Sequence, residues 1–409
     1  MNIAILGAGI IGVTTAYELA ADGHAVTVFE RRASIAEEAS FATAGILGPG
    51  AAVPWVARPL GRGMLMQEPS IRMVRPLSLA DRIWARRRLA ASAPSAFAAS
   101  RARQQWLAIY SSHRLHEVSE RLAYTFDRTE GHLMLLRNHK ERADAEPSLA
   151  NLREMGVPFH EITADEARQL EPSLNPNTRL AGAIYLPQDE VGNCRQFAVI
   201  LRDAAEQLGA RFHFHTPVTA LGRATPASVQ IAGEDTPRHY DAVVLCAGAQ
   251  SAALLAPLGI KVPLQPVYGY SISAAIPETG HAPRSGVTDM RNQVSITRHG
   301  RRVRVSGAME IGGLPDRMEE RAMRTLYQAL ADWFPSAGRL SSGVQAWKGA
   351  CPMLPDGSPL IGPSGIAGLW LNLGHGSSGW ALACGSARLL AHQIGGLVPQ
   401  IDTEGLGLR

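Results

Sequence analysis

Cysteine is scarce in this sequence. The 409 residues include only four cysteines, and no two of them form a CxxC pair. This spacing argues against a structural zinc site and against a disulfide framework, because both need closely spaced or paired cysteines. A reducing compartment is therefore the expected environment.

Long hydrophobic runs are also absent. No uninterrupted apolar stretch approaches the roughly 20 residues that a helix needs to span a bilayer. The apolar segment 2–6 follows Met1 directly, with no basic region or small-residue cleavage site before it, so we see no cleaved export signal. The sequence predicts a cytoplasmic protein whose only membrane contact would be peripheral, at the inner face of the cytoplasmic membrane.

Acidic residues nearly disappear between Trp55 and Gln105, where only Glu68 and Asp81 occur. The formal charge of the whole chain is only +4, yet this stretch carries ten arginines: Arg58, Arg62, Arg72, Arg75, Arg82, Arg86, Arg87, Arg88, Arg101 and Arg103. Apolar bulk between them would suit an anionic lipid surface, but a solvated or partner-facing helix is the favoured interpretation. Nucleic-acid binding is not expected, because no recognition module accompanies the arginines.

A nucleotide-binding motif opens the chain. Residues 3–6 form a short apolar run typical of a buried strand, and a helical pattern follows over 11–21. Between them lies a glycine turn in which Gly7 permits the sharp bend, Gly9 lets a pyrophosphate approach, and Gly12 lets the helix pack closely. The amino end of that helix, with Ile10 and Ile11, would face the phosphates.

An acidic residue follows at the expected distance. Residues 25–29 predict a second strand, and Glu30 comes directly after it, where a carboxylate accepts hydrogen bonds from a ribose diol. Arg31 lies beside this position, but Glu30 would repel a 2′-phosphate. Strand, glycine turn, helix and acid in this order are a strong dinucleotide signal, although they do not separate FAD from NAD.

The next segment is rich in small and hydroxyl residues. It includes Ser40, Thr43, Ala44 and Gly45, and its composition suits backbone passing close to a dinucleotide. An ordinary loop is equally compatible with that composition.

At this point the sequence resembles a known family, the FAD-dependent D-amino acid dehydrogenases, within the wider group of D-amino acid oxidase, glycine oxidase and sarcosine oxidase. The similarity spans nearly the whole chain. Beyond the motifs above, it rests on the segments 48–50, 54–55, 186–194, 244–248, 269–271, 296–298, 355–362 and 372–380.

The resemblance implies a fold of mixed α/β and α+β class. A Rossmann-like FAD-binding domain would be assembled from residues 1–60, 195–260 and 345–409. An inserted antiparallel-sheet domain for the substrate would comprise residues 61–194 and 261–344. The pattern agrees, since residues 241–245 and 369–372 are typical of buried strands and 302–306 alternate as a half-exposed strand should.

The resemblance also assigns FAD contacts beyond the first turn. Val218 matches a position that meets the adenine through its backbone, and Thr43 and Ala44 match the segment along the flavin. The turn after His375 matches one whose backbone donors face the pyrimidine edge of the flavin, where they stabilise negative charge. With Ala247 and Gly248 from the strand end near 245, this turn completes the predicted FAD contacts: Gly376, Ser377, Ser378 and Gly379.

The substrate site departs from the family pattern at one position. Relatives commonly carry an arginine before the proline of a Gly-x-Arg-Pro segment, where it clamps a carboxylate. This chain has Cys351 there. Arg298 is the predicted replacement, with Arg58 and Arg291 as weaker alternatives, and the other predicted substrate contacts are Tyr268, Tyr270 and His375. Some amine oxidases attach FAD through a cysteine in this region, but a buried, unreactive Cys351 is favoured.

The predicted activity is oxidative deamination of D-amino acids by hydride transfer to FAD, with electrons passed to a respiratory acceptor such as a quinone. A secondary amine such as D-hydroxyproline, an opine or sarcosine is an alternative substrate, which the loss of the arginine at Cys351 favours somewhat. A third hypothesis is a flavin-holding subunit of a hetero-oligomer, docked through the arginine-rich stretch. The sequence predicts no metal site.

Overall fold

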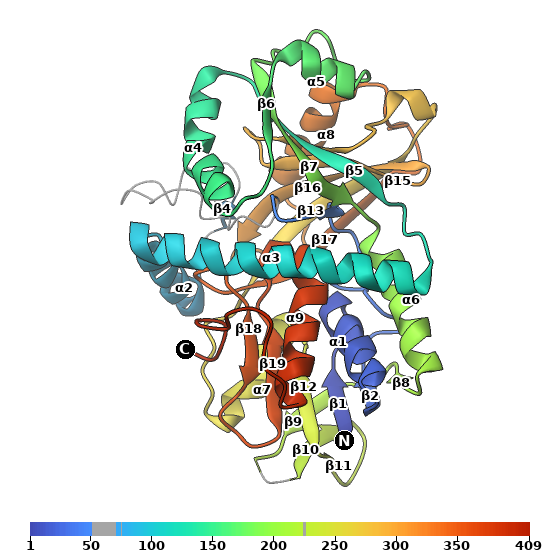
Figure 1. Cartoon of the computed structure of the whole chain (residues 1–409), viewed down its shortest axis with the longest axis vertical. Helices are drawn as coiled ribbons and strands as arrows, with labels where there is room; N and C mark the ends of the chain where they lie inside the picture. The colour runs from blue at the N-terminus through green and yellow to red at the C-terminus, as the bar shows by residue number, and fades with distance from the viewer. Residues whose placement is uncertain (51–70, 75, 224–225) are drawn as a thin grey trace.

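The computed structural model describes residues 1–50, 71–74, 76–223 and 226–409 (Figure 1). Two halves lie one above the other along the longest axis of the molecule. The lower half holds both the N-terminal strand and the C-terminal helix, and the upper half holds the large sheet. The long helix α3 (Pro94–Leu122) crosses between the two halves.

The lower half is built on a six-stranded sheet. Its strand order is β18-β19-β12-β1-β2-β8, and all neighbours are parallel except β18 and β19. The strands are β1 (Asn2–Leu6), β2 (Ala25–Phe29), β8 (Arg211–His213), β12 (Ala242–Leu245), β18 (Leu360–Pro363) and β19 (Leu369–Leu373). Most residues of β1 and β12 are fully buried, because parallel strands are covered on both faces.

Helices and a small sheet cover this core. The helices are α1 (Ile10–Ala21), α6 (Cys194–Gln207), α7 (Ser251–Leu255) and α9 (Gly379–Ile394). A three-stranded antiparallel sheet comprises β9 (Val218–Leu221), β10 (Ala227–Ile231) and β11 (Arg238–Tyr240). No helix in the described ranges combines the length and the apolar character needed to cross a membrane.

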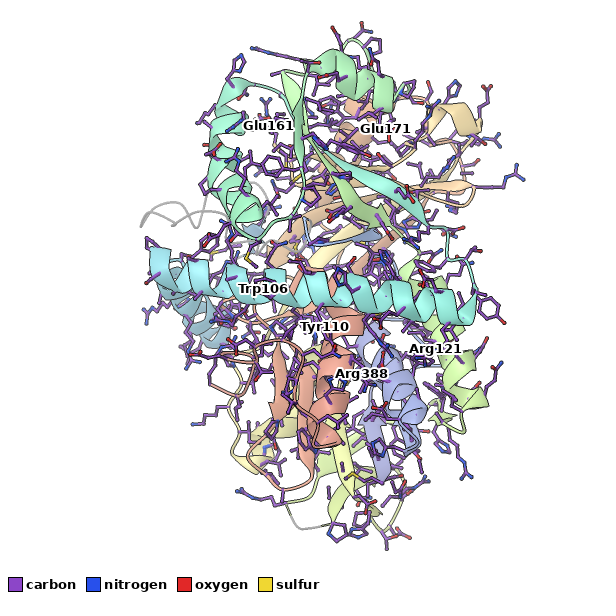
Figure 2. The ribbon with its side chains drawn as sticks, in the orientation of Figure 1. Trp106, Tyr110, Arg121, Glu161, Glu171 and Arg388 are labelled. Atoms are coloured by element: carbon purple, nitrogen blue, oxygen red, sulfur yellow. The ribbon has the colours of Figure 1, made fainter. Side chains whose placement is uncertain are left out.

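A buried carboxylate joins three of the helices. Glu18 of α1 is fully buried and accepts two hydrogen bonds of 2.8 Å from the guanidinium of Arg114 on α3. Arg388 of α9 donates to the same carboxylate at 3.2 Å. Figure 2 shows Arg388 beside Tyr110, on the side of α9 that faces α3. Because each charge is paired, α1, α3 and α9 are held together without an isolated buried ion.

The upper half is built on a ten-stranded sheet. Eight strands have the order β17-β13-β16-β15-β14-β5-β7-β3, while β4 pairs with β16 and β6 with β7. The strands are β3 (Ile46–Leu47), β4 (Ile71–Met73), β5 (Thr129–Leu136), β6 (His160–Ile162), β7 (Gly182–Val191), β13 (Gln265–Ala275), β14 (Gly286–Asp289), β15 (Val294–His299), β16 (Arg302–Ile311) and β17 (Gln345–Met353). The helices of this half are α4 (His139–Glu154), α5 (Ala164–Leu170) and α8 (Glu320–Trp333), whereas α2 (Leu79–Ala91) lies beside α3 between the halves and contacts β13.

The two faces of the large sheet differ in chemistry. In β15, Val294 and Ile296 are fully buried in one hydrophobic cluster with Leu326 and Trp333 of α8. Ser295 and Thr297 alternate with them and therefore point to the opposite face. That polar face is turned toward the lower half.

The predicted fold class is confirmed: a Rossmann-like parallel sheet is combined with a large, mainly antiparallel one. All six strands of the parallel sheet lie within 1–60, 195–260 and 345–409. Two strands from those ranges, β3 and β17, are instead part of the large sheet, where they pair with β7 and β13. The FAD ranges predicted from the sequence thus contribute strands to both sheets.

Candidate functional site

A cavity of about 1190 Å³ lies between the two sheets. Its lower end is lined by the first glycine turn and the ends of β2 and β12, and its upper end by strands of the large sheet and by α4. All but one of the residues predicted to bind FAD line it. The exception is Gly12, which lies behind the turn and packs against the backbone of Gly7.

The glycine turn can accept no side chain at its bend. Gly7 has a φ of +102°, and a Cβ there would lie 2.6 Å from the carbonyl oxygen of Cys246. The turn leads into α1, whose N-cap Gly9 has no capping side chain, and the amide of Ile10 donates to Ser40 Oγ at 3.1 Å. Open backbone and the positive end of a helix dipole together suit a pyrophosphate.

Glu30 is held rigidly at the end of β2. Its buried carboxylate accepts hydrogen bonds from the amides of Ala8 at 2.7 Å and Arg32 at 2.8 Å. The backbone oxygen of Glu30 accepts the Thr216 amide at 2.8 Å, which brings the cavity-lining residues 216–219, including Val218, to the same end. Arg31 also lines this end and is paired with Glu38 at 2.6 Å.

The segment from Thr43 to Gly45 is fixed by the polar face of the large sheet. Thr297 donates to the carbonyl oxygen of Ala44 at 2.8 Å, and Arg304 donates to that of Thr43 at 3.1 Å. His299 lies 3.1 Å from the Thr297 hydroxyl. Burial and the charge of Arg304 lower the pKa of His299 to about 3, so this imidazole is neutral at physiological pH.

The C-terminal turn lines the opposite wall. His375, Gly376, Ser377, Ser378 and Gly379 all line the cavity at the start of α9. The N-cap Ser378 has no side-chain hydrogen bond, so backbone amides dominate this edge. Burial lowers the pKa of His375 to about 3, and its Nε2 atom has no partner within the described structure.

Five residues form a row across the upper wall. They are paired strand to strand in register, each lines the cavity, and we call them the cavity row: Ser306, Ser295, Thr288, Met134 and Ile184. The row is polar in β16, β15 and β14 and apolar in β5 and β7. Beyond its apolar end the cavity is lined by Ala145, Leu149 and Leu152 of α4.

Two of the predicted substrate contacts, His375 and Tyr270, line this cavity. The Tyr270 hydroxyl donates to Glu310 at 2.7 Å, and Glu310 is paired with Lys348 at 2.7 Å. Burial, together with the hydrogen bond to Glu310, raises the pKa of Tyr270, so the phenol stays protonated. Because its hydroxyl is already bound to Glu310, we describe Tyr270 as part of the cavity wall and not as a hydrogen-bond partner of the substrate.

Tyr268 and Arg298 are not among the described residues that line the cavity. Tyr268 is half-buried, and the Lys348 ammonium lies 4.6 Å from the centroid of the Tyr268 ring. Arg298 is half-buried. The side chains of its neighbours Thr297 and His299 lie on the strand face toward residues 43–45. Because side chains alternate along a strand, Arg298 lies on the other face. Arg291, one of the two weaker alternatives, lines the cavity, while Arg58 lies outside the described residues.

Cys351 lines the cavity from β17, between Ala350 and Pro352. Burial raises the pKa of its thiol to about 11, so it is the thiol and not the thiolate at neutral pH. Position 351 therefore supplies no charge to the cavity. Within the described ranges, no group of histidines, cysteines and acids is arranged to hold a metal ion.

Several functional residues were not found from the sequence. Thr297, His299 and Arg304 hold the segment 43–45, and Asn372 lines the cavity with a buried Oδ1 atom that has no partner within the described structure. The available signal is the alternation of Ser295 and Thr297 with the apolar residues Val294 and Ile296, which indicates one polar strand face.

Comparison with known proteins identifies the family. A family model described as FAD dependent oxidoreductase matches residues 2–393. The chain belongs to this family. The residues of the cavity fit the cofactor that the family name gives. Gly7 leaves no room for a Cβ, a buried acid follows β2, and the cavity is also lined by His375 and Asn372, each with a buried polar atom that has no partner among the described residues.

Two similar family members are named D-amino acid dehydrogenase. The one from Cereibacter sphaeroides (strain ATCC 17023) is 40% identical over 422 residues, covering 100% of this chain and 95% of its own. The one from Bradyrhizobium diazoefficiens is 37% identical over 416 residues, covering 99% and 98%.

Solved structures share the fold at low identity. Glycine oxidase from Geobacillus kaustophilus matches with a TM-score of 0.79 and 22% identity, covering 100% of this chain and 98% of its own. L-Proline dehydrogenase from P. horikoshii matches with a TM-score of 0.75 and 18% identity, covering 99% and 96%. These two likenesses show that the chain shares its fold with both proteins.

Proposed function

We propose that this FAD-dependent oxidoreductase oxidises free D-amino acids with an apolar side chain and passes the electrons to a respiratory acceptor. The observation that carries the proposal is the cavity row, which places hydroxyl groups and an apolar pocket side by side in the same cavity as the nucleotide site. The names of the similar relatives support a D-amino acid as the substrate.

The apolar end of the cavity defines the side chain. Met134, Ile184 and Met290 line it together with Ala145, Leu149 and Leu152 of α4. Such a surface gains free energy by burying a hydrocarbon side chain, at roughly 25 cal/mol for each Å² of apolar surface removed from water. We therefore expect substrates with leucine-like or methionine-like side chains to be preferred over alanine-like ones.

The turn between β14 and β15 supplies a cation for the carboxylate. Among the described residues that line the upper half of the cavity, Lys140 and Arg291 carry positive charge. Arg291 follows Asp289, a buried carboxylate that accepts the Arg291 amide at 3.0 Å and the Trp333 indole N–H at 3.0 Å. This anchoring fixes the backbone of the turn, and a guanidinium there suits a carboxylate geometrically. The Arg291 guanidinium is also paired with Glu141 at 2.8 Å, so we assign carboxylate binding to the N–H donors of Arg291 that this ion pair leaves free.

Hydride transfer needs orientation more than a nucleophile. When bound, FAD would supply the acceptor for the hydride that leaves the substrate Cα. The protein holds the substrate between Arg291 and the hydroxyls of the cavity row, so that the Cα–H bond can be aligned. The amide-rich turn 376–379 and the dipole of α9 stabilise negative charge at the pyrimidine edge.

Anaerobic bleaching of the FAD-loaded protein tests the proposal. D-Leucine, D-methionine, D-alanine, their L-enantiomers and N-methyl derivatives are mixed with the protein, and the loss of flavin absorbance is followed. We expect the two bulky D-amino acids to bleach fastest. If only L-amino acids bleach the flavin, the proposed D-stereochemistry of the substrate is contradicted. If no compound bleaches it, the proposed oxidation of amines is contradicted.

A secondary amine is the second candidate substrate. The observation that favours it is the uncharged wall made by Ala350, Cys351 and Pro352. An N-alkyl group could occupy space that a clamping arginine would otherwise take. Faster bleaching by the N-methyl derivatives than by the parent D-amino acids would establish this alternative.

We also propose that the outer face of α2 contacts an anionic membrane surface, from which a quinone would accept the electrons. Leu79 and Ile83 are exposed by 74% and 44%, and Arg82, Arg86 and Arg87 are exposed on the same helix. Apolar side chains surrounded by arginines suit an interfacial helix.

A further inference from the structure

Four polar side chains form a continuous hydrogen-bonded chain that ends at the cavity. Asp189 Oδ2 lies 3.4 Å from His132 Nδ1, and His132 Nε2 lies 2.8 Å from Thr288 Oγ1. Thr288 Oγ1 lies 2.9 Å from Ser295 Oγ. Asp189 and His132 are almost fully buried and Ser295 is half-buried, and the cavity is lined by His132, Thr288 and Ser295.

The chemistry of the two ends sets the direction of the chain. A carboxylate only accepts hydrogen bonds, so Asp189 orients the imidazole with its proton on Nδ1. His132 Nε2 is then an acceptor and takes the hydroxyl proton of Thr288, whose oxygen accepts from Ser295. The free acceptor position of Ser295 is left facing the cavity. Asp189 is itself fixed, because its Oδ1 accepts the Gly50 amide at 2.8 Å.

We propose that this chain is a proton relay that deprotonates the substrate ammonium. The inference rests on the proposed function, because it needs an amine substrate beside Ser295. The ammonium proton passes to Ser295, the Ser295 proton to Thr288 and the Thr288 proton to His132, which becomes an imidazolium facing Asp189. The nitrogen lone pair freed in this way would become the second bond of the product iminium, which carries the same charge as the starting ammonium, as the hydride leaves Cα for bound FAD. One proton and one hydride leave the substrate, so the charges balance.

The surroundings of the relay suit this role. Asp189 is the charged group in hydrogen-bond contact with His132, and Thr288 and Ser295 are neutral. The other charged residues lining the upper cavity are Lys140 and Asp144 of α4, with the Glu141–Arg291 ion pair. A new positive charge on His132 is therefore balanced mainly by Asp189.

The relay also lies beside the carboxylate site. Thr288 belongs to β14 and Ser295 to β15, and the turn that joins these strands carries Arg291. A substrate whose carboxylate binds Arg291 would have its ammonium near the two strands that this turn joins, which carry Thr288 and Ser295. Recognition and deprotonation would thus be performed by one strand–turn–strand unit.

Thr288→Val is the sharpest test, because it removes the hydroxyl that links His132 to Ser295 and keeps the shape of the side chain. The measurement is the anaerobic rate of flavin reduction across pH, using whichever amine of the panel bleaches the wild type fastest. We expect the variant to be about 100-fold slower at pH 7, as for loss of a general base. Its rate should rise tenfold for each pH unit and approach the wild-type rate near the pKa of the free amine.

His132→Gln is the second variant and should give the same pH profile, because it removes the terminal acceptor. Ser271→Ala is the matched control: this buried serine lies in β13 of the same sheet but is not among the described residues that line the cavity. Its pH profile should superimpose on that of the wild type.

Two outcomes would overturn the relay. A Thr288→Val profile parallel to the wild type, merely lowered at every pH, would show a structural role. If no amine of the panel bleaches the wild type, the proposed function and the relay are both contradicted. If the wild type is bleached but the pH profiles of the wild type and Thr288→Val are parallel, only the relay is contradicted.

Discussion

At the scale of single residues, Glu30 shows how one carboxylate organises the cofactor end. It accepts two backbone amides at 2.7 and 2.8 Å and also lines the cavity. The same group therefore fixes the glycine turn relative to β2 and presents acceptor capacity to a ribose. A neutral amide in its place would weaken both kinds of hydrogen bond, since those to charged acceptors are the stronger ones.

We predict that Glu30→Gln weakens FAD binding about tenfold, which corresponds to the roughly 1.5 kcal/mol typical of a charge-assisted hydrogen bond. The measurement is the Kd from quenching of FAD fluorescence on titration with apoprotein. Glu38→Gln, which removes a half-exposed partner of Arg31, is the control and should change the Kd less than twofold. Equal effects in the two variants would contradict a special role for Glu30.

The carboxylate assignment gives a second prediction. Arg291→Ala should raise KM for the best D-amino acid at least about tenfold, because a charged partner of the substrate is lost. Arg298→Ala, the position favoured by the sequence, is the competing variant in the same steady-state assay. A larger rise of KM in Arg298→Ala than in Arg291→Ala would reverse the assignment made from the cavity.

These residues also show what sequence could and could not predict. The cofactor end is carried by backbone in short local motifs, so the glycines at 7 and 9, Glu30 and the turn 376–379 could be named and do line the cavity. The substrate end is assembled from strands far apart in sequence. On β15 a shift of one residue moves a side chain to the other face, so the predicted cation Arg298 and its neighbour Thr297, which contacts Ala44, lie on opposite faces.

At the scale of elements, the packing of three helices depends on one buried acid. Glu18 is fully buried between Arg114 and Arg388, so α1, which begins at the pyrophosphate site, is fixed to α3 and α9. The sequence predicts α1, because its glycine turn and helical pattern are local signals. It could not show that α3 crosses between the halves, since that position depends on contacts with distant residues.

We predict that Glu18→Gln lowers the free energy of unfolding by about 3 kcal/mol, because the two arginines lose the charge that pairs them in a buried site. Urea unfolding of the FAD-saturated protein measures this as a lower midpoint with an unchanged slope. Asp22→Asn is the matched control, since Asp22 binds the same Arg388 at 2.8 Å but is partly exposed, and should cost less than about 1 kcal/mol. Comparable losses in both variants would contradict the prediction.

At the scale of the whole molecule, the helix α2, which carries the basic face, contacts β17, a strand that contributes to the cavity wall. The indole N–H of Trp84 on α2 donates to the carbonyl oxygen of Met353 at 3.0 Å, at the end of the strand that carries Cys351. The same helix therefore packs inward on β17 and exposes Arg82, Arg86 and Arg87 outward. A membrane bound by this face would lie near the cavity wall that β17 forms.

This arrangement predicts binding to phosphatidylcholine vesicles that contain phosphatidylserine and not to vesicles of phosphatidylcholine alone. Changing Arg82, Arg86 and Arg87 together to Gln should weaken binding about 100-fold in a co-sedimentation assay, since each basic residue near an anionic surface contributes about 1 kcal/mol. High salt should weaken vesicle binding by the wild type to a similar extent. The control changes Arg301, Arg321 and Arg324 to Gln, three exposed arginines elsewhere on the surface. If both triple variants bind equally weakly, net charge rather than the α2 face drives the association. If the wild type binds no better to vesicles with phosphatidylserine than to vesicles without it, membrane contact is contradicted altogether.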